Sequence, residues 1–244
     1  MITRRKWIAA APAAGSLFLA ACKKDALPPT YGSLFDASNA LTFAVQRLVL
    51  RNQPLVREFA RDKITANFPA INETNPKDDR YQHHLAGGFA DWRLPIEGLV
   101  ANPTGISLED LKRLPSRTQV TQHNCEQGWS AIAEWTGVPL GRVLQEAGML
   151  PEARYVVFHT VDGWWDSLDM FDALHPQTLL AYGMNGGALP VAHGAPVRLR
   201  VERQLGYKSL KFLSRIDVTD RLDDVEDGTG AVGAAYGYSW YAGI

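Results

Sequence analysis

The pattern of apolar and polar positions along this chain predicts many short strands and a few short helices. Leu41, Val45, Leu48 and Val49 have helical spacing and predict a helix over residues 41–59. Short alternating or apolar runs predict strands over 89–100, 117–124, 154–160, 178–184, 196–202 and 210–219. The fold expected from this pattern is α+β, with mixed β-sheets and short helices.

Local start and stop signals predict three further short helices. Ser107 and Asp110 have the spacing of a capping box and predict a helix that ends near Pro115. A second helix is expected over 139–147, where Gly148 suits the position just after its end, and a third over 168–174. Residues 64–82 are rich in Asn and Pro and are expected to form a loop.

Composition describes an ordinary globular protein with one main domain. The chain has 244 residues, of which 46% are hydrophobic and 21% charged, and its formal net charge is −1. This balance argues against a nucleic-acid partner, because such a surface needs clustered positive charge. We expect the domain to occupy residues 36–244.

The first 21 residues have the pattern of an export signal. A short basic segment precedes an apolar run that is interrupted by Pro12, although an ordinary buried helix is the alternative. Residues 3–8 resemble a twin-arginine signal, and residues 19–22 resemble a bacterial lipobox, in which Cys22 would be lipidated. The expected product is an exported protein on the periplasmic face of a bacterial membrane, anchored by lipid through a tether over 22–35.

Lipidation of Cys22 would leave Cys125 as the only thiol of the domain, since the chain has two cysteines. A lone cysteine is usually a small buried apolar side chain. It can also be a nucleophile if a histidine lies beside it in the fold, and His123, His159, His175 and His193 are the candidates. Position in the sequence does not decide between these interpretations.

Several common site motifs are missing, and the surroundings of Cys125 suggest a metal. The sequence contains no glycine-rich phosphate loop, no haem-attachment motif, no Gly-x-Ser-x-Gly elbow and no second cysteine for a zinc or iron–sulfur site. Cys125 follows a predicted strand, where a side chain can face a cleft. A thiolate suits a thiophilic metal, but one protein thiolate needs further ligands from a cofactor, such as the two sulfurs of a pterin dithiolene.

Four segments in order carry a resemblance to a known family. They are residues 125–140, 155–160, 168–190 and 193–211. Residues 89–220 resemble the molybdopterin-binding domain of the sulfite oxidase superfamily, and are closer to the branch that includes the periplasmic methionine-sulfoxide reductase catalytic subunit. The resemblance implies that fold and a molybdenum–molybdopterin cofactor.

The same resemblance implies roles for individual residues. Cys125 would ligate molybdenum and be the catalytic residue, and Thr160 would contact the pterin or an oxo-side group. His193 and Arg198 would bind the pterin and its phosphate, and Ser209, Leu210 and Lys211 would contribute backbone N–H groups and positive charge to that phosphate. The upstream loop departs from the family pattern, and its candidates are Phe68 and Asn72.

One departure from the pattern bears on the substrate. Sulfite-oxidising members place an arginine soon after the ligand cysteine, whereas this chain has Glu126. A carboxylate there would repel sulfite by about 1–4 kcal/mol at short range. A small neutral substrate for oxygen-atom transfer, such as a sulfoxide or an N-oxide, is therefore expected.

The expected oxidoreductase would need an external source of electrons. Because the sequence has no haem or flavin motif, its electron-transfer partner would be a separate protein, such as a cytochrome c or a membrane haem protein. The sequence also leaves two other functions open. The alternatives are a sulfite dehydrogenase, and a cofactor-free lipoprotein that uses the same fold as a binding module.

Overall fold

The computed structural model describes residues 26–30, 32 and 36–244. The predicted leader, Cys22 and part of the tether lie outside the described residues. The helices are α2 (Asp36–Val49), α3 (Asp79–Ala86), α4 (Leu108–Arg113), α5 (Leu140–Glu146) and α6 (Met170–Ala173), with 3-10 turns η1 (Arg61–Lys63), η2 (Val191–His193), η3 (Gly206–Lys208) and η4 (Val232–Tyr236). None of the described helices is long and apolar enough to cross a bilayer.

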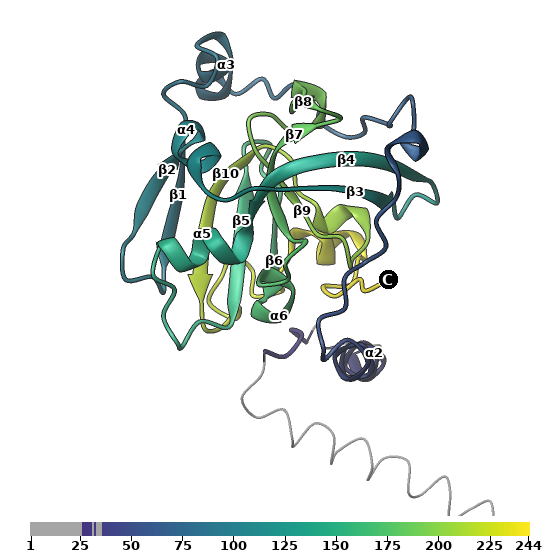
Figure 1. Ribbon diagram of the computed structural model, residues 1–244. Helices are drawn as coiled ribbons and strands as arrows, with labels where there is room; N and C mark the ends of the chain where they lie inside the picture. Colours follow the sequence, from purple (N-terminus) through teal and green to yellow (C-terminus); the bar gives the residue numbers. More distant parts are fainter. Residues whose placement is uncertain (1–25, 31, 33–35) are drawn as a thin grey trace, which may run out of the picture.

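The first of two five-stranded sheets has the order β2-β1-β10-β5-β6 (Figure 1). Its strands are β1 (Arg93–Gly98), β2 (Thr104–Ser107), β5 (Tyr155–Thr160), β6 (Trp165–Asp169) and β10 (Leu213–Thr219). β1 and β10 run parallel, with Ile96 opposite Ile216, and the other pairs are antiparallel. This mixture of pairings confirms the predicted α+β class.

The second sheet is built on a long hairpin. Its strands are β3 (Arg117–Asn124), β4 (Ser130–Pro139), β7 (Leu179–Met184), β8 (Gly187–Ala188) and β9 (Arg198–Arg200). β4 pairs with β3 over the full length of β3, and β7 pairs with β4, β8 and β9. Gly137 allows the close approach to β7, because a Cβ there would lie 2.3 Å from the carbonyl oxygen of Leu180.

The main core lies between the two sheets and under α5. The first sheet contributes Leu94, Phe158 and Ile216, and the second contributes Val138 and Leu199, all fully buried. α5 supplies Leu140, Val143 and Leu144 to the same core. The sheets therefore form a rigid body on which the connecting loops are held.

Several predicted elements are confirmed. The strand over 117–124 has the predicted bounds, and Ser107 caps α4 by accepting a hydrogen bond from the N–H of Asp110. α5 lies within 139–147, and Gly148 follows it with φ +71°. The strands over 154–160 and 178–184 differ from the observed β5 and β7 by one residue.

Other predicted bounds were wrong for identifiable reasons. The first helix ends at Val49 rather than at residue 59, since Gln53 has φ +52° and the chain continues extended past Pro54. The strand over 89–100 begins only at Arg93, after Phe89 with φ +61°. The strand over 210–219 begins at Leu213, after Phe212 with φ +55°. Positive φ interrupts regular structure at each of these points.

Pairing with neighbouring strands decided the remaining differences. The first two residues of the helix expected over 168–174 instead belong to β6 at the sheet edge, and Asp169 then caps the short α6. β4, which was not predicted, is the partner of β3. The strand over 196–202 is reduced to β9, and α3 begins inside the loop expected over 64–82.

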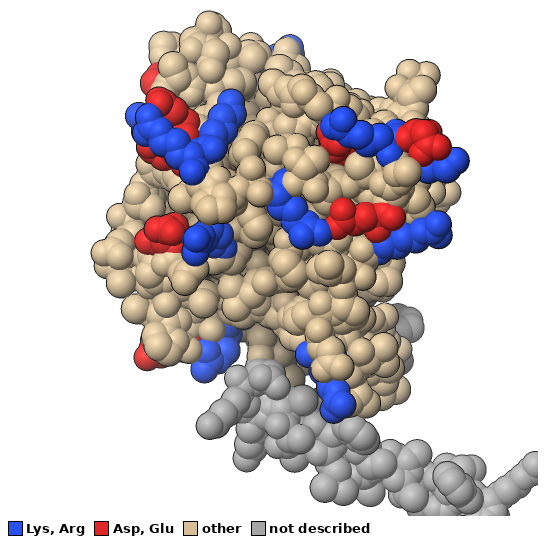
Figure 2. Space-filling model, viewed as in Figure 1, with Lys and Arg blue, Asp and Glu red and all other residues tan. Residues whose placement is uncertain are grey.

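Charged side chains are mixed in sign over the surface that Figure 2 displays. Positive and negative groups lie side by side there, separated by uncharged surface, so this face has no extended basic patch. This agrees with the net charge of −1.

Candidate functional site

Cys125 lies in the tight turn that joins β3 to β4. Its N–H donates to the carbonyl of Trp129 over 2.9 Å, and its carbonyl accepts from the N–H of Gly128, which has φ +90°. The Cys125 side chain is buried, with Sγ 3.5 Å from Glu126 Oε2 and 3.5 Å from the N–H of Gln127. Burial, together with the negative charge of Glu126, raises the pKa of the thiol above its ordinary value.

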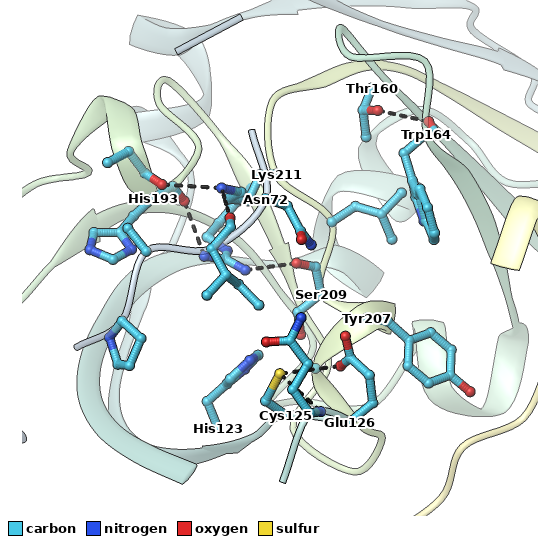
Figure 3. A pocket seen from close by; sticks show the side chains of 18 of the residues that line it. Asn72, His123, Cys125, Glu126, Thr160, Trp164, His193, Tyr207, Ser209 and Lys211 are labelled. Atoms are coloured by element: carbon cyan, nitrogen blue, oxygen red, sulfur yellow. Dashed lines mark hydrogen bonds between the residues drawn. The ribbon is translucent and has the colours of Figure 1, made fainter. Parts of the chain in front are cut away.

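One cavity of about 310 Å³ contains all of the predicted site residues of the domain (Figure 3). Six segments carry these residues to the cavity: the β3–β4 turn, the end of β5, the loop before α3, η2, the start of β9 and the loop after η3. The residues predicted from the sequence that line it are Phe68, Asn72, Cys125, Thr160, His193, Arg198, Ser209, Leu210 and Lys211.

Arg198 places a buried positive charge in this cavity. Its guanidinium donates to the carbonyls of His193 (3.1 Å) and Ser209 (2.7 Å), while its Nε has no hydrogen-bond partner among the described residues. Burial, with the nearby charge of Arg200, lowers the pKa of Arg198 to about 9. No carboxylate of the described chain forms an ion pair with it. A buried cation in this condition is stabilised by an anionic ligand.

Lys211 adds a second positive charge and holds the upstream loop in place. Its Nζ donates to the carbonyls of Ile71 (2.7 Å), Glu73 and Ala192 (3.2 Å). Burial and the charge of Arg198 lower the pKa of Lys211 to about 8. The loop that contains Phe68 and Asn72 is thereby fixed over the cavity, although its sequence departs from the family pattern.

His193 and Phe68 lie beside these two cations. Their rings meet edge to face at 5.6 Å. Burial lowers the pKa of His193 to about 4, with smaller contributions from Arg198 and Lys211. His193 is therefore neutral at pH 7 and adds no charge of its own, but its ring nitrogens can still hydrogen-bond to a ligand.

His123 is a further cavity residue, and its protonation state is fixed by a buried network. Arg200 donates to His123 Nδ1 over 2.7 Å and forms an ion pair with Glu202 at 2.9 Å. Burial and the charge of Arg200 lower the pKa of His123 to about 2. The ring is consequently neutral with its proton on Nε2. Gly206 packs against it, because a Cβ there would lie 2.4 Å from Nε2.

Thr160 and Ser209 reach the cavity with their hydroxyl groups already engaged. Thr160 Oγ1 lies 2.7 Å from the carbonyl oxygen of Trp164 and 2.5 Å from Asp162 Oδ1. Ser209 Oγ accepts from the N–H of Val201 over 3.1 Å. These hydroxyls hold the local backbone, so the two segments offer mainly their backbone groups to a ligand.

The remaining wall of the cavity is aromatic and was not predicted. Trp164 stacks on Tyr236 with ring centroids 5.7 Å apart, and Tyr207 stacks on Tyr238 at 4.8 Å. All four rings line the cavity, and two of them come from the C-terminal tail. The abundance of aromatic residues after Gly228 was the one sequence signal for this wall.

The arrangement separates two chemistries within one cavity. A thiol and a carboxylate lie in the β3–β4 turn (Figure 3). Two cations that form no ion pair with a carboxylate of the described residues lie farther along the cavity, Arg198 on β9 and Lys211 in the loop after η3. Among the described residues, no three His, Cys, Asp or Glu side chains are grouped to hold a metal ion. The partners of Cys125 Sγ are Glu126 and a backbone N–H rather than a histidine, which does not favour a cysteine–histidine nucleophile.

These donors fit a cofactor that carries both a thiophilic metal and a phosphate. The thiol can supply one soft ligand, and the open Nε of Arg198 can donate to a phosphate oxygen. Lys211, whose three N–H groups already donate to carbonyls, adds positive charge beside it. The cations are buried before any ligand binds, so the protein contains a site for an anion that its own side chains do not neutralise.

Comparison with known proteins agrees with this geometry. A model of the oxidoreductase molybdopterin binding domain matches residues 83–225, which is more than half of the chain. A solved structure, the sulfane dehydrogenase SoxCD from Paracoccus pantotrophus, is similar with a TM-score of 0.51 and 30% identity, over 59% of this chain and 39% of that one.

Curated relatives match over a similar region. A protein named as the protein-methionine-sulfoxide reductase subunit YedZ1 of Azospira oryzae is 39% identical over 63% of this chain and 56% of its own length. The protein-methionine-sulfoxide reductase catalytic subunit MsrP is 30% identical in Campylobacter jejuni, over 66% of this chain and 61% of its own length. The protein of the same name in Xanthomonas axonopodis is 33% identical, over 56% of this chain and 47% of its own length.

The match therefore spans about half to three fifths of the length of these relatives. It includes the turn that carries Cys125 and the segments that carry Arg198 and Lys211. With the mixed two-sheet fold and the cavity that joins a thiol to an anion site, this chain belongs to the family of oxidoreductase molybdopterin-binding domains.

Proposed function

We propose that this protein is a molybdenum–molybdopterin oxidoreductase that reduces a sulfoxide. The observation that carries the proposal is one cavity in which a buried thiol is accompanied by Arg198 and Lys211, neither of which pairs with a carboxylate of the described residues. When bound, the cofactor supplies two-electron oxygen-atom transfer: a sulfoxide takes up two electrons and two protons and yields a sulfide and water.

The protein's own residues would bind and orient this cofactor. Cys125 would donate the protein's thiolate to molybdenum, and metal binding would overcome the raised pKa of the thiol. Arg198 and Lys211 would hold the phosphate, with Phe68, Asn72, Thr160, His193, Ser209 and Leu210 as the remaining contacts. His123, whose proton is fixed on Nε2 by Arg200, would present a neutral donor.

Glu126 supports a neutral substrate over an anion. Its carboxylate lines the cavity 3.5 Å from Cys125 Sγ. Sulfite approaching this end would meet like charge, with no cation in contact with Glu126 among the described ion pairs. The relatives named as methionine-sulfoxide reductases favour a sulfoxide, and we extend that substrate class to this chain.

Export and lipid anchoring belong to the same proposal. The twin-arginine-like segment and the lipobox-like Cys22 would place the folded enzyme on the periplasmic face of a bacterial membrane. Electrons would come from an external donor, either a cytochrome c or a membrane haem protein. Mass spectrometry of the purified protein tests the anchor, because a lipidated Cys22 would be the new N-terminus.

Substitution of the thiol tests the proposed chemistry. We expect Cys125→Ser in the exported full chain to lose most of its molybdenum and about 10³-fold or more of its sulfoxide reduction, because the soft ligand is lost. Metal content and reduced-dye assays measure both. Thr118→Ser, at an exposed position of the same strand, is the matched control. Full activity of the Cys125→Ser protein would refute the proposal.

A substrate screen separates the candidate functions. The purified protein is assayed with methionine sulfoxide and an N-oxide in the reducing direction, and with sulfite in the oxidising direction. Faster turnover of sulfite than of any sulfoxide would identify a sulfite dehydrogenase. Absence of molybdenum after cofactor-replete expression would instead favour the binding module.

A further inference from the structure

An apolar surface gathers on α2, away from the cofactor cavity. Six of the nine exposed large hydrophobic side chains of the described residues lie between Leu27 and Leu55. Four of them follow one face of α2 at helical spacing and are more than half exposed: Leu41 (62%), Val45 (51%), Leu48 (53%) and Val49 (71%). We call these four residues the outer face of α2. A patch of this kind on a protein surface usually marks an interaction site.

The opposite face of α2 fixes this orientation. Phe43 is buried against Trp240 and Tyr241, with ring centroids 5.9 and 5.1 Å apart. One turn later, Arg47 donates to Asp169 and Asp172 over 2.8–2.9 Å. Turning the outer face inward would break these buried ion pairs, so the aliphatic side chains remain on the outside.

The chain direction places this helix close to the predicted lipid. Ala26, Leu27 and Pro28 line a second cavity of about 610 Å³ together with Phe43 and Phe171, between α2 and the body of the molecule. Cys22 precedes Ala26 by four residues and can be at most about 14 Å from it along an extended chain. A lipid on Cys22 would therefore bring a bilayer next to α2.

The charge around the helix also suits a membrane. On the face that Figure 2 displays, basic side chains lie near α2, and the acidic residue of the helix, Asp36, lies in its first turn, away from Arg47 in its last turn. Arg51, two residues after the end of the helix, is exposed. Positive charge beside an apolar helix face attracts the anionic headgroups of a bilayer.

We propose that the outer face of α2 inserts into the surface of a lipid bilayer and forms a second membrane contact beside the predicted lipid on Cys22. The inference rests on the proposed anchoring, and it also fixes how the enzyme sits on the membrane. A lipid on Cys22 would hold the protein at one point only, and the helix contact would also fix its orientation at the surface. α4 and α3 would face away from the bilayer, at the opposite end of the molecule (Figure 1).

A fluorescent probe on α2 tests this arrangement in the full exported chain. Val45→Cys and, as control, Lys112→Cys on α4 are labelled with an environment-sensitive fluorophore, while Cys125 is buried. The proteins are added to vesicles of phosphatidylethanolamine and phosphatidylglycerol with brominated acyl chains. We expect about threefold or stronger quenching of the Val45 probe, because interfacial helices reach the acyl boundary, and none of the Lys112 probe.

A second variant separates the helix contact from the lipid anchor. Leu41→Ser with Leu48→Ser should abolish quenching of the Val45 probe while the protein stays on the vesicles through Cys22. Protein that never associates with vesicles and lacks lipid by mass would refute the anchor. Vesicle-bound protein whose Val45 probe is unquenched would refute the helix contact. The helix contact would also be refuted if the fluorescence of the Val45 probe changed only when a second copy of this protein or an added membrane protein bound to α2.

Discussion

Arg198 combines a buried positive charge with incomplete hydrogen bonding. Its guanidinium is buried, it donates to two carbonyls, and its Nε has no partner among the described residues. Burial and Arg200 lower the pKa of Arg198 to about 9, so the charge is poorly stabilised before a ligand binds. A planar guanidinium can donate two parallel hydrogen bonds to a phosphate, which is the role that we propose for Arg198.

Removing this charge should therefore separate stability from cofactor retention. In the cofactor-free protein, we expect Arg198→Met to leave the free energy of unfolding unchanged or raise it by about 1 kcal/mol, because an uncompensated buried charge is lost. After cofactor-replete expression, the pterin content should fall about tenfold or more, as expected for loss of a charge-assisted contact. Urea unfolding and fluorescence of the oxidised pterin measure the two effects.

Arg215→Met, at an exposed position of β10, is the control for this experiment. Normal pterin content in Arg198→Met would contradict the assignment of Arg198 to the phosphate. If the cofactor-free Arg198→Met protein is instead destabilised enough to account for its lower pterin content, the role of Arg198 is purely structural.

Among the elements, α2 depends on one buried ion-pair cluster for its attachment. Arg47 pairs with Asp169 and Asp172, and Asp172 also pairs with Arg203. The guanidinium of Arg47 lies 4.4–4.7 Å from the ring centroids of Phe43, Phe171 and Tyr241. The helix is thus joined to α6 and to the C-terminal tail through charge as well as apolar contact.

Breaking this cluster should loosen α2 first. We expect Arg47→Met to lower the free energy of unfolding by about 3–5 kcal/mol, because two buried carboxylates lose a partner. Chemical unfolding measures this change, and limited proteolysis should cut residues 36–60 before the rest. Arg113→Met removes exposed ion pairs with Glu109 and Asp110 and should cost less than about 1 kcal/mol. Equal losses in both variants would contradict the structural account.

The whole molecule should respond to acid through its buried histidines. His175 is 1% exposed; its Nδ1 accepts from the N–H of Gln177, and its Nε2 lies 3.2 Å from the carbonyl oxygen of Pro54. Burial lowers the pKa of His175 to about 4, below the ordinary value of 6.5. Between these values the unfolded chain binds more protons, so the free energy of unfolding falls as the pH falls.

Replacing this histidine should flatten the acid dependence. From pH 6.5 to 4, His175 contributes a loss of up to about 3 kcal/mol, which His175→Asn should remove even if its stability at pH 7 is lower. Urea unfolding at several pH values gives the slope. Leu174→Ala, an exposed neighbour that does not titrate, should keep the parental slope. An unchanged slope in His175→Asn would contradict the lowered pKa.

Features that depend on neighbours in the chain were determined by the sequence alone. The strand that ends just before Cys125, the cap at Ser107 and the helix expected over 139–147 follow from short-range patterns, and they form at or within the predicted bounds. The ordered motifs also identified the family and named nine residues that lie along one cavity. Their individual roles remain predictions.

Tertiary structure decided the features that depend on distant partners. The spacing of Leu41, Val45 and Leu48 predicted a helix, but only the pairing of Arg47 with Asp169 determined that this face points outward. Lys211 holds the loop at residues 71–73, which lies 138 or more residues earlier in the chain. Arg200 donates to Nδ1 of His123 and so leaves the ring proton of His123 on Nε2. A local pattern specifies backbone conformation, whereas burial, charge pairing and a cavity arise only when segments far apart in the chain meet.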